Sequence, residues 1–268
     1  MSRNVPAGHD IGDFPPFAVT VDIVILSVVD GVLFVLLVER KEKPYKKAWA
    51  LPGGFKRPDE TLDEAARREL REETGVDAPR HLSQFGAYGD PKRDPRGNVV
   101  TVGYLAVTPE VGAVIAGTDA SDARVWPVAE ALTGDVELAF DHATILADAI
   151  ERAAADLESS DLATAFVGPS FTLTELQHVY EAVWDDQLDT ANFRRSLSAS
   201  GAAARSGAAA ARPSPAAAAF VVPLGVHAES TRRGGRPPEL YEAGGGWGED
   251  GSPVKRPRKK TLRPKQPE

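Results

Sequence analysis

The chain has 268 residues, a hydrophobic content of 42% and no cysteine, which is typical of a globular protein and excludes disulfides, thiol catalysis and cysteine-bound zinc. Its net charge of −8 is unevenly distributed. Residues 1–150 hold 16 basic and 24 acidic residues, residues 151–198 hold 3 and 9, and residues 199–268 hold 12 and 6. We therefore expect the basic C-terminal third to be the part that meets a polyanion.

The N-terminal segment has no apolar core of the signal-peptide kind. The longest apolar stretch, Ile23 to Val38, is interrupted by Asp30-Gly31, which is a hairpin turn signal. It is also shorter than the roughly 20 residues of a membrane helix. We expect two paired strands over residues 17–39 and a soluble, cytoplasmic protein with no membrane partner.

The rest of the first half mixes strand and helix patterns. Residues 48–51 lead into a turn at 52–54, and a helix is predicted from Thr61 to Thr74, with Thr61 and Glu64 as a capping box and Gly75 as the stop. β-branched runs within residues 97–109 and 122–128 predict further strands. These elements indicate one layered α/β (α+β) unit over residues 17–150.

A dense acidic motif spans the predicted helix. The segment GFKRPDETLDEAARRELREETGV fits Gly-x5-Glu-x7-Arg-Glu-U-x-Glu-Glu-x-Gly-U at every position, where U is a bulky aliphatic residue. The specified positions are Gly54, Glu60, Arg68, Glu69, Leu70, Glu72, Glu73, Gly75 and Val76.

The spacing of the acidic residues indicates a metal site. At about 100° per residue, Glu69 and Glu73 fall inside the apolar stripe of the helix and Glu72 borders it. Like charges at i, i+3 and i+4 repel each other, so a purely solvated face of paired charges does not explain them. A hard cation at their focus would turn this repulsion into ligation.

The motif resembles the signature of the Nudix hydrolases. That resemblance implies Mg²⁺ (or Mn²⁺) bound by Glu69, Glu72, Glu73 and a main-chain carbonyl at Gly53. It also implies that Arg68 braces the helix through Glu60. In the reaction that it implies, water attacks a pyrophosphate and one carboxylate acts as the base, with Glu69 and Glu72 among the candidates. The sequence leaves the identity of the base open.

The segment Gly89 to Val107 looks like the loop and strand of Nudix proteins that act on ADP-ribose. Arg93 and Arg96 are candidate diphosphate contacts, because guanidinium matches phosphate geometry; the alternative is that they are ordinary loop charges. The five histidines have no ligand spacing, and we assign them no role.

The second half predicts a helix-turn-helix. An amphipathic helix from Asp141 to about Ser159 is followed by a Gly-Pro break and a second capping box, Thr172 with Glu175. The helix that it opens carries one apolar stripe, and a second small helix starts near Asp189 or Thr190. Such a pair serves in DNA binding and also in dimerisation or docking.

Beyond the helices the chain changes character. Residues 199–219 are an Ala-rich insertion that we expect to be disordered, with part of it possible as helix. Two short strands are predicted at 220–224 and 236–241, flanking a basic loop. Residues 243–268 are predicted to be a disordered basic tail, with seven basic residues from Lys255 to Lys265.

Residues 158–242 resemble the winged-helix domain of the Nudix-related transcriptional regulators (the NrtR type). The resemblance implies a homodimer that senses ADP-ribose, binds double-stranded DNA and represses genes of NAD biosynthesis. The residues expected to contact DNA, on the second helix and in the wing, are Asn192, Arg194, Arg195, Arg232, Arg233 and Arg236.

Two functions compete. The favoured one is an ADP-ribose-binding regulator that binds DNA. Because its acidic motif is intact, we expect it also to hydrolyse ADP-ribose to AMP and ribose 5-phosphate. The alternative is an ADP-ribose or nucleotide-sugar pyrophosphohydrolase whose C-terminal part has no DNA-binding role. A sanitiser of oxidised nucleoside triphosphates would leave residues 160–241 unexplained.

Overall fold

The computed structural model describes residues 11–76, 79–109, 123–206, 219–228, 237–245 and 252–257. The N-terminal elements are a 3-10 turn (Ile11–Asp13), β1 (Ala18–Val29), β2 (Val32–Glu39), β3 (Trp49–Ala50), β4 (Gly53–Phe55), α1 (Leu62–Thr74), β5 (His81–Tyr88), β6 (Val99–Val107), β7 (Ala123–Pro127) and α2 (Val128–Thr133). The remaining elements are α3 (His142–Ser159), α4 (Leu162–Ala165), α5 (Leu173–Trp184), α6 (Thr190–Ser206), β8 (Val221–His227) and β9 (Glu239–Ala243). No helix in these ranges is long and apolar enough to cross a bilayer.

A seven-stranded mixed sheet organises the first half. Its main order is β3-β2-β1-β6-β5, with β4 also paired to β1 and β7 to β2. β1 and β6 run parallel, and the other pairs are antiparallel. The predicted hairpin is confirmed: Asp30 and Gly31 have φ values of 50° and 78°, which suits the tight turn between β1 and β2.

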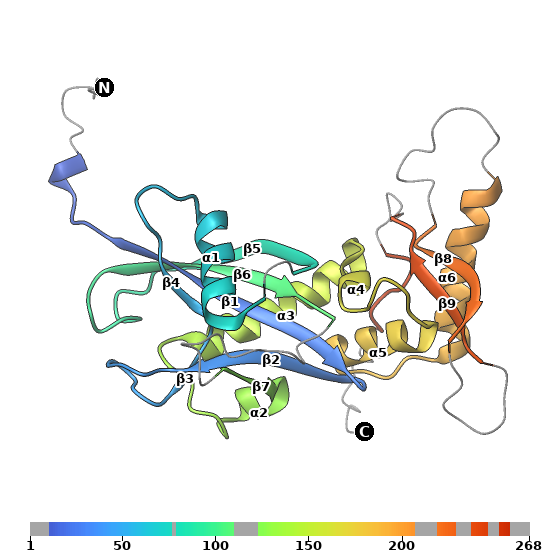
Figure 1. Ribbon diagram of the computed structural model, residues 1–268, viewed down its shortest axis with the longest axis horizontal. Helices are drawn as coiled ribbons and strands as arrows, with labels where there is room; N and C mark the ends of the chain where they lie inside the picture. Colours follow the sequence, from blue (N-terminus) through green and yellow to red (C-terminus); the bar gives the residue numbers. More distant parts are fainter. Residues whose placement is uncertain are drawn as a thin grey trace, which may run out of the picture.

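Helices cover both faces of this sheet (Figure 1). α1 packs Ala65, Ala66 and Leu70 against Val21 and Ile23 on one face. On the other face, α3 contributes to a larger buried cluster around the opposite side of β1. Because both faces are covered, β1 reads as a continuous apolar run without clear alternation.

Local capping explains where α1 and α5 begin. Thr61 and Glu64 form the predicted capping box, and α1 ends at Gly75, whose φ is 70°. Thr172 and Glu175 form the same device at the start of α5. Both capping boxes that the sequence predicts are therefore confirmed.

The turn predicted at residues 52–54 is wrong in part, because Gly53–Phe55 is a strand paired with β1. A Cβ on Gly53 would lie 2.1 Å from the Val21 carbonyl oxygen. The absence of a side chain is what allows this close approach, and the Gly-Gly pair is therefore compatible with a strand edge as well as a turn.

The C-terminal half contains the predicted helix pair and a two-stranded sheet. α5 and α6 follow each other closely, and β8 pairs antiparallel with β9. α3 runs without a break through residue 150, and its buried face belongs to the same cluster as Leu176, Tyr180 and Trp184 of α5. The two halves consequently share one core.

The structure bears on two expectations about the end of the chain. α6 extends to Ser206, so the first part of the Ala-rich insertion is helix, which is the alternative that the sequence left open and which accords with the high helix propensity of alanine; residues 207–218 lie outside the described ranges. Residues 252–257, within the segment expected to be disordered, pack on the body, where Ser252 and Val254 are buried. Apolar and hydrogen-bonding contacts available only in the folded chain account for this difference.

Candidate functional site

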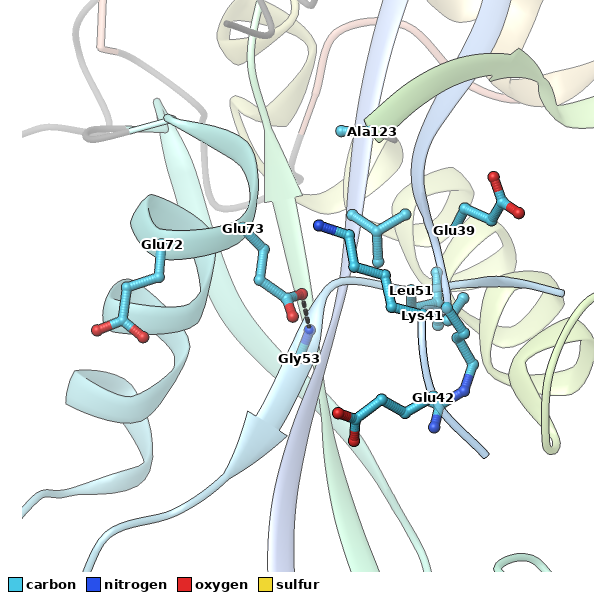
Figure 2. A pocket seen from close by; sticks show the side chains of 11 residues that line it. Glu39, Lys41, Glu42, Leu51, Gly53, Glu72, Glu73 and Ala123 are labelled. Atoms are coloured by element: carbon cyan, nitrogen blue, oxygen red, sulfur yellow. Dashed lines mark hydrogen bonds between the residues drawn. The ribbon is translucent and has the colours of Figure 1, made fainter. Parts of the chain in front are cut away.

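Helix α1 turns its acidic residues toward strand β4. Glu69 is buried, whereas the side chain of Glu72 is 51% exposed. Glu73 points at Gly53, and Glu72 lies on the outer side of the helix (Figure 2). Two of the three predicted ligands therefore converge on the Gly53-Gly54 backbone, and the third stands at the solvent edge.

Arg68 holds this end of the helix to the preceding loop. Its Nε donates to Glu60 Oε2 at 3.0 Å, and its Nη2 donates to Glu60 Oε1 at 2.7 Å and to the Phe55 carbonyl at 3.1 Å. Its Nη1 donates to Glu69 Oε1 at 2.6 Å and to Glu72 Oε2 at 3.3 Å. Hydrogen bonds from Arg68 and from the Arg57 backbone lower the pKa of Glu60 to about 2. The contact expected between Arg68 and Glu60 is present.

Glu73 is a partly buried carboxylate with one backbone donor. Its Oε2 accepts a hydrogen bond from the Gly53 N–H at 2.9 Å. Burial raises the pKa of Glu73 to about 7, and the nearby Glu69 and Asp22 add to this effect. The protein thus holds an acidic group where negative charge is costly without a cation.

Glu69 lies directly against Gly54. A Cβ on Gly54 would be 2.2 Å from Glu69 Oε1, so a larger residue there would occupy the space of the carboxylate. Burial raises the pKa of Glu69, and the hydrogen bond from Arg68 opposes this change. The glycine of the motif is therefore explained by the position of Glu69.

The acidic residues suit a divalent metal by their chemistry. Carboxylate and carbonyl oxygens are the donors that Mg²⁺ and Mn²⁺ prefer, and Glu69, Glu72, Glu73 and Gly53 supply only such donors. Within the described ranges, no three His, Cys, Asp or Glu side chains are grouped closely enough to hold a metal ion. Arg68 and the Gly53 N–H hold the carboxylates instead, and Glu72 also pairs with Arg57 at 3.7 Å at the solvent edge.

A cavity of about 350 Å³ opens beside Glu73 (Figure 2). Its walls come from the end of β2 and from the strand that contains Gly53. The charged residues that line it are Glu39, Arg40, Lys41, Glu42, Glu72 and Glu73. The acidic motif therefore forms one wall of a space large enough for a small ligand.

A second cavity of about 180 Å³ shares Arg40, Leu51 and Gly53 with the first. Both candidate diphosphate contacts, Arg93 and Arg96, line it. The structure places both of them near the acidic motif, and their surroundings differ from each other.

Arg93 is a buried ion-pair residue. Its Nε and Nη2 donate to Asp141 at 2.9 and 2.7 Å, and Nη2 also reaches Asp22 at 3.4 Å. These carboxylates already occupy much of the guanidinium edge that a diphosphate would need. Arg93 therefore contributes to the second cavity mainly by holding the side chains of Asp22 and Asp141 in place.

Arg96 is exposed and lies among aromatic rings. It pairs with Asp94 at 2.6 Å, and its guanidinium lies over the Phe55 ring at 5.2 Å and over the Phe140 ring at 5.5 Å. Stacking of this kind fixes the plane of a guanidinium. The Nε and Nη2 of Arg96 both donate to the Asp94 carboxylate, so one edge is occupied, as it is in Arg93. Arg96 differs from Arg93 in that its side chain is exposed. Arg96 is thus better placed than Arg93 to meet an incoming ligand.

Three residues of the cavities were missed by the sequence analysis. Arg40 donates from Nε to the Pro44 carbonyl at 2.9 Å and lies 4.7 Å from the Phe140 ring centre. Burial, and then the charge of Arg96, lower its pKa. Asp22 interrupts the apolar run of β1, which was the one visible signal among these residues.

His142, to which no role was assigned, is buried at the start of α3. Its Nδ1 accepts a hydrogen bond from the Leu51 N–H at 2.9 Å, so the ring is neutral and carries its proton on Nε2. That nitrogen faces Asp22 Oδ1 at 3.7 Å. Burial lowers the pKa of His142.

The candidate DNA contacts on α6 face outward. Phe193 and Leu197 are buried, whereas Asn192, Arg194 and Arg195 are exposed. Arg195 Nη1 donates to Asn192 Oδ1 at 2.6 Å. The predicted contacts of the wing, Arg232, Arg233 and Arg236, lie outside the described residues.

Comparison with known families agrees with this division of the chain. Residues 16–149 match the NUDIX domain, and residues 164–210 match the NrtR DNA-binding winged helix domain. The fold is therefore a mixed α/β NUDIX domain followed by a winged-helix domain, as the sequence predicts.

Three relatives cover different parts of the chain. The ADPR responsive transcriptional repressor NtrR of Acinetobacter baylyi is 39% identical over 197 residues, which cover 73% of this chain and 78% of that protein. The ADP-ribose pyrophosphatase of Methanocaldococcus jannaschii is 40% identical over 124 residues, which cover 45% and 70%. The structure of Shewanella oneidensis NrtR complexed with a 27mer DNA is similar with a TM-score of 0.69 and 31% identity, over 85% of this chain and 94% of that one.

Proposed function

Since the chain belongs to the Nudix-related transcriptional regulators of the NrtR type, we propose that it is an ADP-ribose-responsive repressor that binds DNA through α6 and also hydrolyses ADP-ribose. One observation carries the proposal. The same chain combines a complete acidic motif, seated on Gly53-Gly54 beside a cavity, with a helix pair whose outer face presents Asn192, Arg194 and Arg195.

For the ligand, we propose that Arg40 and Arg96 contact the diphosphate and that Arg93 orders the wall of the cavity that holds it. Arg40 lines both cavities, and Arg96 lines the second with an exposed side chain. ADP-ribose fits this assignment because it joins a diphosphate to two sugars and a base, which need space on both sides of the charged centre. The ADP-ribose link of the A. baylyi and M. jannaschii relatives supports this choice of ligand.

For the chemistry, we propose hydrolysis of the pyrophosphate. Oxygen from water would bond to one phosphorus and the bridging P–O bond would break, giving AMP and ribose 5-phosphate. A divalent metal held by Glu69, Glu72, Glu73 and the Gly53 carbonyl would supply charge neutralisation for the developing phosphate charge. Arg68 keeps Glu69 in place through its link to Glu60, and a neighbouring carboxylate takes the proton from water.

For DNA, we propose that α6 enters the major groove with Arg194 and Arg195 toward bases or phosphates. The exposed side of α6 and the buried pair Phe193 and Leu197 fit this geometry. We expect a two-fold dimer to bind a two-fold operator upstream of genes of NAD synthesis. The resemblance of the fold to the DNA complex of S. oneidensis NrtR supports this part of the proposal.

One experiment separates the regulator from an enzyme without a DNA-binding role. A gel shift on DNA upstream of the NAD-synthesis genes of the host is run with and without ADP-ribose, and AMP release is followed with Mg²⁺ or Mn²⁺. A specific shift that ADP-ribose weakens, together with AMP release, is expected. Absence of a specific shift would leave the pyrophosphohydrolase alone, and a shift without AMP release would leave a sensor alone.

A further inference from the structure

The segment after the wing, residues 252–256, returns to the body of the molecule, and we call it the strap. Ser252 is 1% exposed and Val254 is 5% exposed. The Ser252 N–H donates to the Glu158 carbonyl at 2.9 Å, and Lys255 Nζ donates to the same carbonyl at 3.3 Å. The strap therefore satisfies a carbonyl of the last turn of α3, which has no partner within its own helix.

The strap also touches the centre of the winged helix. The hydroxyls of Ser252 and Tyr180 are 2.9 Å apart, and this contact is buried. Tyr180 belongs to α5, and its ring packs on Trp184 at 4.9 Å and on Phe193 of α6 at 5.8 Å between centroids. A chain of contacts thus connects the strap, α5 and the helix proposed to enter DNA.

Helix α3 connects these contacts to the ligand cavity. Near its C-terminal end, the Ala154 carbonyl accepts from Trp184 Nε1 at 3.0 Å, and Arg256 of the strap lies 3.5 Å from Glu151. At its N-terminal end, Asp141 holds Arg93 in the wall of the second cavity. A helix of this length spans about 27 Å, so one rigid element reaches from the cavity to the winged helix.

We propose that the strap fastens the winged helix to α3, and that Ser252 is a positioning residue through which ligand occupancy changes DNA affinity. The inference rests on the proposed function. The strap joins the C-terminal end of α3, at Glu158, to Tyr180 of α5, so that a displacement of α3 at the cavity moves α6. Without the strap, the hydrogen bond between Trp184 and Ala154 remains, but α5 loses its second attachment to the end of α3.

Two shortened chains test the strap, and between them they differ in charge only by Lys255 and Arg256. A chain ending at Pro257 keeps the strap, and a chain ending at Gly251 lacks it; both lack the basic residues from Arg258 onward. The measured quantity is the coupling ratio, the Kd for operator DNA with saturating ADP-ribose divided by the Kd without it. We expect a ratio of at least about 5 in the full chain and in the chain ending at Pro257, and a ratio near 1 in the chain ending at Gly251.

Point variants guard against a shortened chain that fails to fold. Tyr180→Phe and Ser252→Ala each remove one hydroxyl of the buried contact, and we expect each to lower the coupling ratio, with the double variant no worse than either single one. Calorimetry with ADP-ribose, without DNA, checks that the ligand cavity is intact in every variant.

The outcomes are distinguishable. Equal coupling ratios in the chains ending at Gly251 and Pro257 would overturn the role of the strap and leave the proposed function standing. Hydroxyl variants that lower the Tm but keep the full ratio would show that Ser252 is only structural, and would also overturn it. A full chain with a ratio of 1 would overturn the proposed function, and the strap's role with it.

Discussion

Two parallel hydrogen bonds join the guanidinium of Arg68 to the carboxylate of Glu60, at 3.0 and 2.7 Å, across eight residues of sequence. Arg68→Gln would remove this paired contact and leave Glu60 with one backbone donor. We expect the free energy of unfolding to fall, because both hydrogen bonds join charged groups and their side chains are only slightly exposed. Arg68→Lys should recover little of this, because a lysine cannot donate in parallel. Urea denaturation measures the change.

Arg67→Gln is the matched control, because Arg67 lies one residue earlier on the exposed side of the same helix. Its free energy of unfolding should stay within about 0.5 kcal/mol of the parent. If both variants lose the same stability, the contact with Glu60 is not what holds this end of α1.

Glu73→Gln tests the acidic site without disturbing the fold. The amide oxygen of the new side chain can still accept from the Gly53 N–H, so the Tm should change little. We expect AMP release from ADP-ribose with Mg²⁺ to fall by about a hundredfold or more, because a metal-binding charge is lost. Asp59→Asn, at an exposed loop position outside the site, removes the same charge and should keep full activity. Undiminished turnover in Glu73→Gln would contradict the metal assignment.

Alanine at the two glycines of β4 should have different effects. In Gly53→Ala the new Cβ meets a backbone oxygen, Val21 O at 2.1 Å, so the sheet must shift and stability should fall by about 1–3 kcal/mol. In Gly54→Ala the Cβ meets the end of the Glu69 side chain at 2.2 Å, which can move away. Gly54→Ala should therefore lose activity more than stability. Equal losses of stability in the two variants, measured by thermal unfolding, would contradict this account.

His142 should make stability depend on pH. Burial lowers its pKa in the folded protein below the ordinary value of 6.5, so the unfolded chain binds a proton that the folded chain does not. The contribution of neutral His142 to the free energy of unfolding is complete above pH 6.5. It is lost as the pH falls below that value, by up to about 1.4 kcal/mol per pH unit.

Glu73, whose pKa is raised to about 7, acts in the opposite sense, since its burial costs stability as the pH rises. The comparison is therefore made between the parent and His142→Asn, in which an amide oxygen can still accept from the Leu51 N–H. The difference between their free energies of unfolding should shrink as the pH falls from 7 to 5.5. A difference that is constant over this range would show that His142 titrates alike in both states.

Arg194→Ala and Arg195→Ala test the DNA-binding face. Each is expected to weaken operator binding, and loss of one phosphate contact should reduce the slope of log K against log salt by about 0.9. Fluorescence anisotropy over a range of salt concentrations measures both quantities. Arg152→Ala, an exposed arginine on α3 paired with Asp156, is the control and should bind as the parent does. Equal DNA binding by all three variants would contradict the placement of α6 at the DNA interface.

Local spacing explains what could be predicted from the sequence. Caps at Thr61 and Thr172 and the hairpin at Asp30-Gly31 depend on residues close together in the chain. The buried and exposed faces of the helix that starts at Thr190 follow in the same way from its periodicity. The contact between Arg68 and Glu60 was expected only from the resemblance to the Nudix hydrolases.

Long-range contacts explain what could not be predicted. The ion pair of Arg93 with Asp141 could not be predicted, because the two residues lie 48 positions apart. His142 acquires its role from Leu51, 91 residues earlier. The strap appeared to be part of a disordered tail, because the composition of residues 252–257 gives no sign of Tyr180, 72 residues before it.

The most direct test of the central claim is the affinity of the full chain for operator DNA as ADP-ribose is added. Fluorescence anisotropy of labelled DNA is followed with the Glu73→Gln variant, so that the ligand is not consumed during the titration. We predict that saturating ADP-ribose weakens DNA binding by at least about fivefold, and that AMP with ribose 5-phosphate does so far less. A DNA affinity that is the same at every ADP-ribose concentration would contradict the claim that this chain connects an ADP-ribose site to DNA.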